Sequence, residues 1–254
     1  MKTRSVAKAE ENNRIIPTWV ALIGVSLYSL CMYSSSYWAA KPQDFAPILT
    51  KYTGRWSFLT FHSNFLNFVY WLLLLLTCIS KKRITSLEKF CIQIYPLMFT
   101  LGVFICVGYY ALDHFNPVNM SRKIMLQQTK YPMIFYSSHC EHGHALPAAL
   151  LLAFNLRKND DLFKNIPTVS DVFYMVGGYI IFYLIEVHWI YYNTGEWVYP
   201  VIKDVTMQGG DIARIAFLGI LTGINILLGL AGLVLVNSME EYRNNTFTTA
   251  KKMR

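Results

Sequence analysis

The sequence has few charged residues: Asp, Glu, Lys and Arg make up 15% of its 254 residues, against roughly 25% in soluble domains. It also lacks low-complexity tracts and repeats of the length typical of solenoid proteins. Hydrophobic residues make up 54% of the chain, and the mean hydropathy is positive. This composition excludes an ordinary soluble domain and indicates an integral membrane protein.

None of the five cysteines has a partner at C-x-x-C spacing, and all lie within or beside apolar runs. We therefore expect them to be buried as small hydrophobic residues and not to form a disulfide framework. The formal net charge of +8 would suggest a nucleic-acid partner in a soluble protein. Here Lys and Arg flank apolar segments, so we explain the charge by membrane topology and expect no nucleic-acid partner.

Apolar segments of about 20 residues, the length needed to cross a bilayer, occur six times. The expected spans are 16–38, 58–79, 90–112, 133–156, 172–192 and 212–236. The connections between them are short, so the sequence predicts an all-α, polytopic helical bundle. We expect one membrane domain at 16–236, an N-terminal tail at 1–15 and a C-terminal tail at 237–254. The first span exceeds a usual signal peptide in its leader and its apolar run, which favours a retained signal anchor.

The two tails and the loops after spans two and four carry more Lys and Arg than the opposite loops. By the positive-inside rule, both termini are expected in the cytosol. The chain ends in KKMR, which has the form of a dilysine retrieval signal. It predicts the endoplasmic reticulum, with the plasma membrane as the alternative. The sequon at Asn119 is expected in a lumenal loop, where it can be glycosylated, and the one at Asn244 in the cytosol, unused.

Polar side chains within the expected spans collect in the lumenal halves. They include Thr60, Asn64, Asn67, His139, His142, Glu186 and Arg214. The first three share one helical face, and the two histidines share another. Ionisable groups within spans are costly and usually face a bundle interior or a water-filled cavity. The one-sided cluster therefore predicts a single polar pocket that opens toward the lumenal leaflet.

The segment YSSHCEHGHALPAAL at 136–150 is the least apolar part of any expected span. Pro147 lacks a backbone N–H and clashes with the carbonyl of Gly143. We expect the helix to be bent or loosened there, beside His142.

Three interpretations of this segment remain open from the residues alone. A zinc site could use His139 and His142, with Glu141 or His144 as a further ligand, although the spacing matches no strong zinc motif. Alternatively, a neutral histidine could take the proton of a hydroxyl that attacks an ester. The hydroxyls at a matching depth belong to Thr60, Ser57 and Ser63. The third interpretation is a non-enzymatic lipid carrier or regulator.

Three stretches, in order, resemble the motifs of one known family. GRWSFLTF at 54–61 resembles G-x-W-x-F-L-T, HCEHGHALP at 139–147 resembles H-G-x-H-x-x-x-L-P, and WIYYNTGEWVYP at 189–200 resembles W-x-x-x-x-T-G-x-W-V-Y-P. YALD and ARIAFLG add smaller matches. The family is that of the androgen-induced protein and the androgen-dependent TFPI-regulating protein. Its members are multi-span membrane hydrolases of fatty acid esters of hydroxy fatty acids. The chain departs from the motif at Cys140, where the family has glycine, and at the additional His144.

The resemblance implies that Thr60 is the nucleophile and His142 its base, in a mechanism without metal ion or cofactor. The substrate, a lipid ester, would come from the bilayer, and its carboxylate could pair with Arg55 or Arg214. The residues that could orient His142 are His139, Asn64, Asn67 and Glu186.

Overall fold

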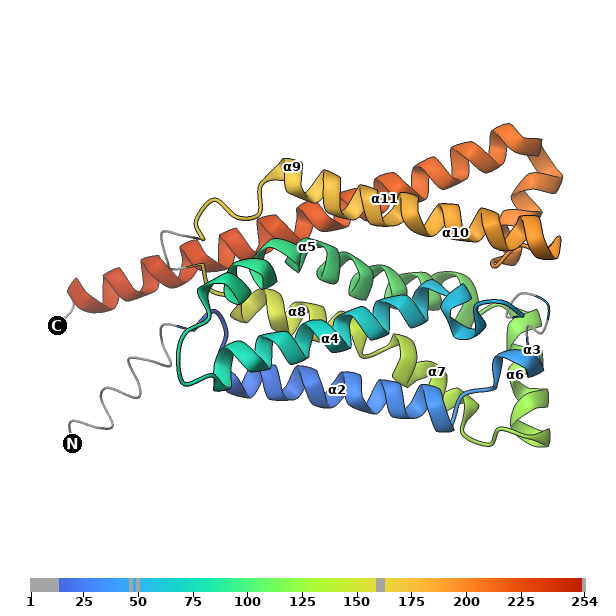
Figure 1. Ribbon diagram of the computed structural model, residues 1–254, viewed down its shortest axis with the longest axis horizontal. Coiled ribbons are helices and arrows are strands. Elements are labelled where there is room, and N and C mark those ends of the chain that lie inside the picture. Colours follow the sequence, from blue (N-terminus) through green and yellow to red (C-terminus); the bar gives the residue numbers. More distant parts are fainter. Residues whose placement is uncertain (1–13, 46–47, 49–50, 159–162, 253–254) are drawn as a thin grey trace.

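The computed structural model describes residues 14–45, 48, 51–158 and 163–252. Most of the 1–15 tail and the last two residues of the KKMR motif lie outside these ranges. Within the described ranges the secondary structure is helical, and the long helices run side by side in an elongated bundle (Figure 1). The all-α architecture expected from the sequence is confirmed.

Each expected span corresponds to one pass along the bundle. The passes are α2 (Thr18–Tyr37), α4 (Leu59–Ile79), α5 (Thr85–Gly108) with the π-helix η2 (Tyr109–His114), α7 (Ile134–His142) with α8 (Ala145–Asn155), α9 (Val169–Val172) with η3 (Phe173–Gly177) and α10 (Gly178–Thr194), and α11 (Pro200–Lys252). The start of α2 and the C-terminal part of α11 lie at the same end of the bundle (Figure 1). That arrangement suits a chain whose two tails share one side of a membrane.

Five of these passes are helices long and apolar enough to cross a bilayer, and the pass expected at 133–156 differs from them. It is divided into α7, with nine residues, and α8, with eleven, and each is shorter than the about 20 residues of a full span. The interruption falls at Gly143 and His144, where Pro147 cannot supply the N–H that the carbonyl of Gly143 would accept in a continuous helix. The loosening expected beside His142 is confirmed.

Short helices lie in the connections at the opposite end of the bundle (Figure 1). They are α3 (Pro42–Phe45), η1 (Gly54–Ser57) and α6 (Pro117–Thr129). At the same end α11 is kinked at Gly210, whose φ of 66° and ψ of −161° are not helical. The straight part of α11 therefore begins at Asp211, close to the expected start of the sixth span.

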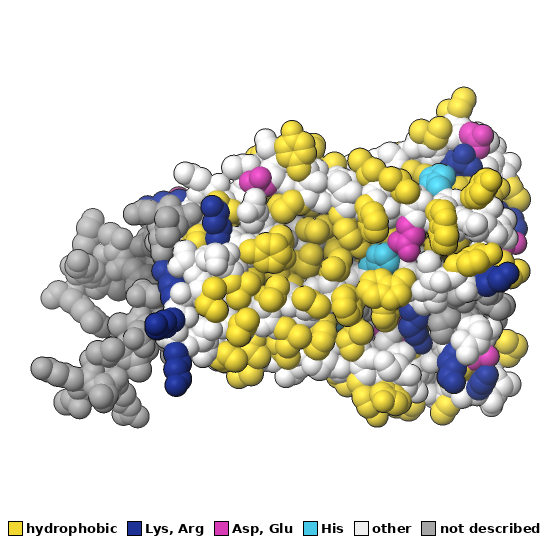
Figure 2. Space-filling model, in the orientation of Figure 1, with side chains coloured by type: hydrophobic (Ala, Val, Ile, Leu, Met, Phe, Trp, Pro, Cys, Tyr) yellow, Lys and Arg dark blue, Asp and Glu magenta, His cyan; other side chains and the backbone are white. Residues whose placement is uncertain are grey.

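Close approach of α2 to α4 organises one side of the core. A Cβ atom on Gly24 would lie 2.0 Å from the ring of Trp71, so only glycine permits this packing. Small residues at helix contacts are typical of membrane bundles, where close packing must replace the hydrophobic effect. On the outside, hydrophobic side chains cover the middle of the face shown in Figure 2, and Lys and Arg lie toward its two ends. This distribution and the long apolar helices identify a multi-pass membrane protein.

Candidate active site

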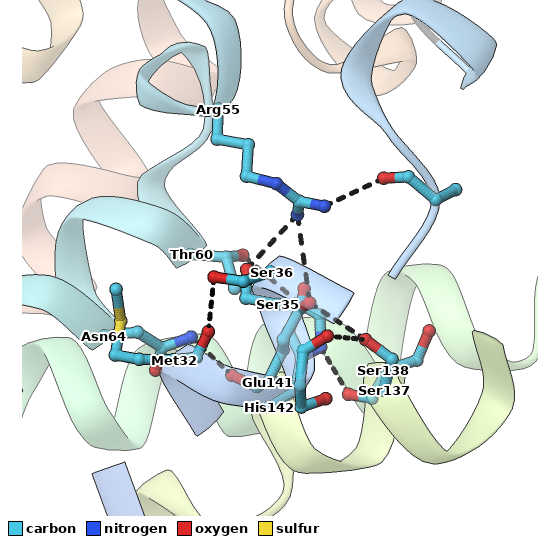
Figure 3. A network of polar contacts seen from close by, with 12 residues as sticks. Met32, Ser35, Ser36, Arg55, Thr60, Asn64, Ser137, Ser138, Glu141 and His142 are labelled. Atoms are coloured by element: carbon cyan, nitrogen blue, oxygen red, sulfur yellow. Dashed lines mark hydrogen bonds and ion pairs between the residues drawn. The ribbon is translucent and has the colours of Figure 1, made fainter. Parts of the chain in front are cut away.

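The first turn of α4 and the last residue of α7 bring two of the expected site residues together. Thr60 is the second residue of α4, and His142 is the last residue of α7. The Oγ1 of Thr60 lies 3.3 Å from the Nε2 of His142, although 82 residues separate them in the chain. Both side chains are partly buried. Figure 3 shows them at the meeting point of α2, α4 and α7.

The second ring nitrogen of His142 determines what the first can do. Nδ1 lies 2.7 Å from the carbonyl oxygen of Ser138, one turn back on α7. A carbonyl only accepts hydrogen bonds, so Nδ1 carries the proton and donates it. In the neutral ring Nε2 then has a free lone pair, and this lone pair faces the hydroxyl of Thr60. The pair has the geometry of a hydroxyl and its general base.

Tyr109 fixes the plane of the His142 ring. The two rings are stacked, with centroids 3.9 Å apart and an interplanar angle of 13°. Tyr109 is itself held in place through its hydroxyl, which lies 3.2 Å from the Nδ1 of His114 and accepts a hydrogen bond from Lys123 at 3.3 Å. Lys123 lies on α6, so this connection helix supports the imidazole indirectly.

Further hydrogen bonds hold the two helices in register. The side-chain N–H of Asn64 donates to the carbonyl of Glu141 at 2.8 Å, which ties α4 to the backbone next to His142. At the start of α4, the backbone N–H of Leu59 meets the hydroxyls of Tyr183 at 2.9 Å and Tyr199 at 3.1 Å. Thr60 therefore sits between two anchored points.

A second group of polar contacts adjoins the pair (Figure 3). Arg55 donates to the hydroxyl of Ser35 at 3.2 Å and to the carbonyl of Ala40 at 2.9 Å, and it lies 3.9 Å from a carboxylate oxygen of Glu141. The same carboxylate oxygen accepts a hydrogen bond from Ser137 at 3.0 Å. Glu141, which on sequence alone could be a zinc ligand, therefore belongs to an ion pair with Arg55.

The other residues considered as supports for His142 have different partners. His139 is exposed, and its Nδ1 lies 2.8 Å from the hydroxyl of Tyr110. Asn67 donates to the carbonyl of Ser63 on its own helix, 3.0 Å away. Glu186 lies 3.5 Å from His62. Of the three candidates that lie outside α7, Asn64 is the one that contacts this helix, and its contact is with the backbone.

Arg214, the alternative partner for a substrate carboxylate, forms an ion pair with Asp211 at 2.9 Å and lies over the ring of Trp197. Arg55 is thus the arginine found in the network around Thr60 and His142. The sequence reasoning missed Ser138 and Tyr109 as direct partners of the imidazole. The first could have been found, since a helical histidine can reach the carbonyl four residues back, but the ring stack depends on tertiary packing.

Two further observations bear on the interpretations left open by the sequence. Among the described residues, no group of three or more His, Cys, Asp and Glu side chains is arranged to hold a metal ion. The hydroxyl of Ser57 pairs with that of Thr53 at 2.5 Å, and Ser63 is fully buried. Of the three hydroxyls considered, that of Thr60 meets the imidazole.

Comparison with known proteins agrees with the resemblance seen in the motifs. The family model described as FAR-17a/AIG1-like protein matches residues 14–237. The Androgen-induced gene 1 protein of Homo sapiens is 24% identical over 252 residues, which cover 89% of this chain and 96% of that protein. No solved structure matches the chain. The chain therefore belongs to the FAR-17a/AIG1-like family, a membership that suggests a hydrolase-like membrane protein.

Proposed function

We propose that this protein is a membrane-embedded carboxylic ester hydrolase in which Thr60 is the nucleophile and His142 its general base. The observation that carries the proposal is the 3.3 Å contact between the Thr60 hydroxyl and Nε2 of His142. Because Nδ1 donates its hydrogen to the carbonyl of Ser138, Nε2 is free to accept a proton. Family membership supports the same class of activity.

The reaction begins when Nε2 of His142 takes the proton of Thr60 and Oγ1 attacks the ester carbonyl. The imidazolium then gives its proton to the departing alkoxide, which leaves as an alcohol, and an acyl-threonine remains. Water attacks this ester, with His142 again as the base, and releases the acid. Thr60 is in the first turn of α4, so the positive end of the helix dipole lies beside the ester carbonyl, whose oxygen becomes negatively charged in both steps.

The proposed substrate is a fatty acid ester of a hydroxy fatty acid, whose ester bond lies away from its carboxylate. Arg55 is the residue proposed to attract this carboxylate, because its guanidinium belongs to the network next to Thr60 and is partly exposed. The acyl chains would lie in the hydrocarbon core, where water is excluded. For the compartment we propose the endoplasmic reticulum, on the strength of the KKMR terminus.

The experiment compares hydrolysis of such an ester by wild type, Thr60→Ala, Thr60→Ser and His142→Ala, each purified into lipid nanodiscs. The matched control is Thr77→Ala, because Thr77 lies on the same helix and its hydroxyl donates to Leu74. We expect turnover by wild type and by the control, partial turnover by Thr60→Ser, and a loss of about 10³-fold or more in the two alanine variants. Full turnover in both alanine variants would disprove the pair.

Two added measurements separate the alternatives. A fluorophosphonate probe should label wild type at Thr60 and leave Thr60→Ala unlabelled. Loss of turnover with a chelator, with the Thr60 variants still active, would instead favour a zinc hydrolase. Tight lipid binding without turnover of any ester by wild type would favour a carrier or regulator.

A further inference from the structure

The first turn of α4 carries a second polar group on its other side. His62 follows Thr60 by two residues, which places their side chains about 200° apart around the helix axis. His62 is buried, with 6% of its surface exposed. Its Nε2 lies 2.6 Å from the carbonyl of Trp56, and its Nδ1 lies 3.1 Å from the hydroxyl of Tyr179.

These two contacts fix the hydrogens around His62. The Trp56 carbonyl can only accept, so Nε2 carries the proton, and in the neutral ring Nδ1 accepts the hydrogen of the Tyr179 hydroxyl. Both nitrogens of the imidazole are thereby used. The ring has no further hydrogen to offer to a neighbour.

Glu186, on α10, faces the same imidazole and lacks a hydrogen-bond donor. Its Oε2 lies 3.5 Å from Nε2 of His62, whose hydrogen is already directed to the shorter contact with Trp56. Oε2 is buried and has no hydrogen-bond partner among the described residues. A buried carboxylate oxygen without a donor is costly, and a ligand that brings a donor would relieve that cost.

A cleft of about 370 Å³ provides the space for such a ligand, within the size range of small-molecule sites. Its apolar walls are Trp56, Phe65, Leu66, Tyr179 and Phe182. Phe182 is 58% exposed and Phe65 36%, so the cleft opens onto the outer surface of α4 and α10, where lipid would lie. In Figure 2 an acidic side chain and a histidine lie next to each other, surrounded by hydrophobic side chains.

The depth of the site restricts the chemistry of the ligand. His62 lies three residues inside the start of α4, about 4.5 Å along the axis, and Glu186 lies eight residues before the end of α10, about 12 Å. A charged head group at this depth would have to leave the membrane interface, which is costly. A neutral hydroxyl attached to a hydrocarbon body can reach it.

From these observations, we propose that the α4–α10 cleft binds a lipid alcohol whose hydroxyl donates to Glu186 and whose hydrocarbon body lies against the aromatic walls. The shared chemistry is a hydroxyl on an apolar body, which a sterol or a hydroxylated acyl chain can supply. The site is separate from Thr60 and His142 and does not depend on hydrolysis.

The experiment uses the full chain in nanodiscs and a photoactivatable, clickable hexadecanol as the probe. Its methyl ether has nearly the same shape without the donor and is the matched control ligand. We expect the alcohol to label peptides that contain Phe65 or Phe182. We expect labelling by the ether to be weaker by about ten-fold, the loss typical of one hydrogen bond to a charged group. Equal labelling by the two probes would overturn the proposal.

The protein variants make the same comparison from the other side. Glu186→Leu should reduce labelling by the alcohol to the level of the ether, and Glu186→Gln, whose amide oxygen still accepts, should retain part of it. Glu196→Gln, in the exposed turn that follows α10, and Thr60→Ala should label like wild type, even if Thr60→Ala abolishes hydrolysis. Unchanged labelling in Glu186→Leu, or a crosslink between two copies of the chain through this cleft, would contradict the proposal.

Competition identifies the natural source of the hydroxyl. Unlabelled cholesterol and unlabelled hydroxystearic acid are added separately, with stearic acid as the control that lacks the alcohol. Displacement by one of the first two supports the site and names the source. Displacement by stearic acid to the same extent as by hydroxystearic acid would count against recognition of the alcohol.

Discussion

Thr60 and His142 meet at the ends of two different helices, with 3.3 Å between Oγ1 and Nε2. Both helix ends are held by further contacts. The start of α4 is capped by Tyr183 and Tyr199, and the end of α7 is tied by Asn64. The contact between the two side chains is therefore set by the bundle and not by the local sequence.

If Thr60 and His142 act as one unit, the effects of removing them should not add. Thr60→Ala and His142→Ala should each lower kcat/KM by about 10³-fold or more. The kcat/KM of the double variant should lie within about ten-fold of that of the less active single variant. The measurement is a double-mutant cycle on ester hydrolysis. Strictly additive losses would show that the two residues contribute separately.

The stack of Tyr109 on His142 should affect activity through the ring and not through the hydroxyl. Tyr109→Leu removes the aromatic face and should lower kcat by up to about ten-fold, since such contacts contribute roughly 0.5–1.5 kcal/mol. Tyr109→Phe keeps the face and loses only the contacts to His114 and Lys123, so it should stay within about three-fold of wild type. A greater loss in Tyr109→Phe than in Tyr109→Leu would contradict this role.

Asn64 and Asn67 provide a matched comparison of two buried amides on α4. Asn64 reaches the carbonyl of Glu141 on α7, whereas Asn67 reaches Ser63 on its own helix. Asn64→Leu leaves a carbonyl without its donor, so it should lower stability by roughly 1–3 kcal/mol and also reduce kcat. Asn67→Leu should lower stability by less and leave kcat unchanged. Thermal unfolding in detergent and turnover of the folded fraction measure both effects.

Gly143 has no room for a side chain. An added Cβ would lie 2.9 Å from the hydroxyl oxygen of Tyr110 and 2.9 Å from the carbonyl oxygen of His139. Gly143→Ala should therefore push the end of α7 away from Tyr110 and reduce turnover by about ten-fold or more, since misplacement by about 1 Å is costly for catalysis. Tyr110→Phe removes one of the two clashing atoms, so the double variant should recover part of the lost turnover. No recovery would place the strain at the His139 carbonyl instead.

The contact of Asp44 with Lys130 and Tyr131 should make stability depend on pH in acid. The hydrogen bonds from Lys130 and Tyr131 hold the pKa of the Asp44 carboxyl below its ordinary value. A lowered pKa stabilises the fold above the unfolded value of about 3.9, and this contribution is lost as the pH falls through the folded value. Asp44→Asn should lower Tm at pH 7, and the difference from wild type should shrink below about pH 4. A Tm difference that stays constant from pH 7 to pH 3 would contradict this account.

Much of the bundle could be predicted because its main determinants are local. The spans follow from runs of apolar residues, and the division of the fourth pass follows from the missing N–H of Pro147. The α6 helix could not be recognised in the same way, since its sequence is short and is not an apolar run. Its Lys123 acts through Tyr109, which is a tertiary contact.

In the candidate site, too, some features follow from the local sequence and others depend on tertiary packing. The types of residue and the direction of the spans put Thr60 and His142 at a similar depth, and the family motifs selected the pair. Partners could not be assigned by depth alone, because several polar groups share one level of the bundle. Glu186 is an example: it lies at a suitable depth for His142, but α10 places it beside His62, on the other face of α4. The sequence does not determine which helices are neighbours in the bundle, and this order decides which polar groups meet.

The break at Gly143 and His144 separates two properties that a continuous helix would couple. The nine-residue α7 carries His142 and its hydrogen bonds, whereas the eleven-residue α8 carries Ala145, Ala148 and Leu152 against the apolar core. Substitutions in α8 therefore act first on the packing of this core, and the break keeps them from turning the imidazole through a continuous helix. Under the proposed function, the packing around α8 and the position of the base on α7 would change separately, because no continuous helix links them.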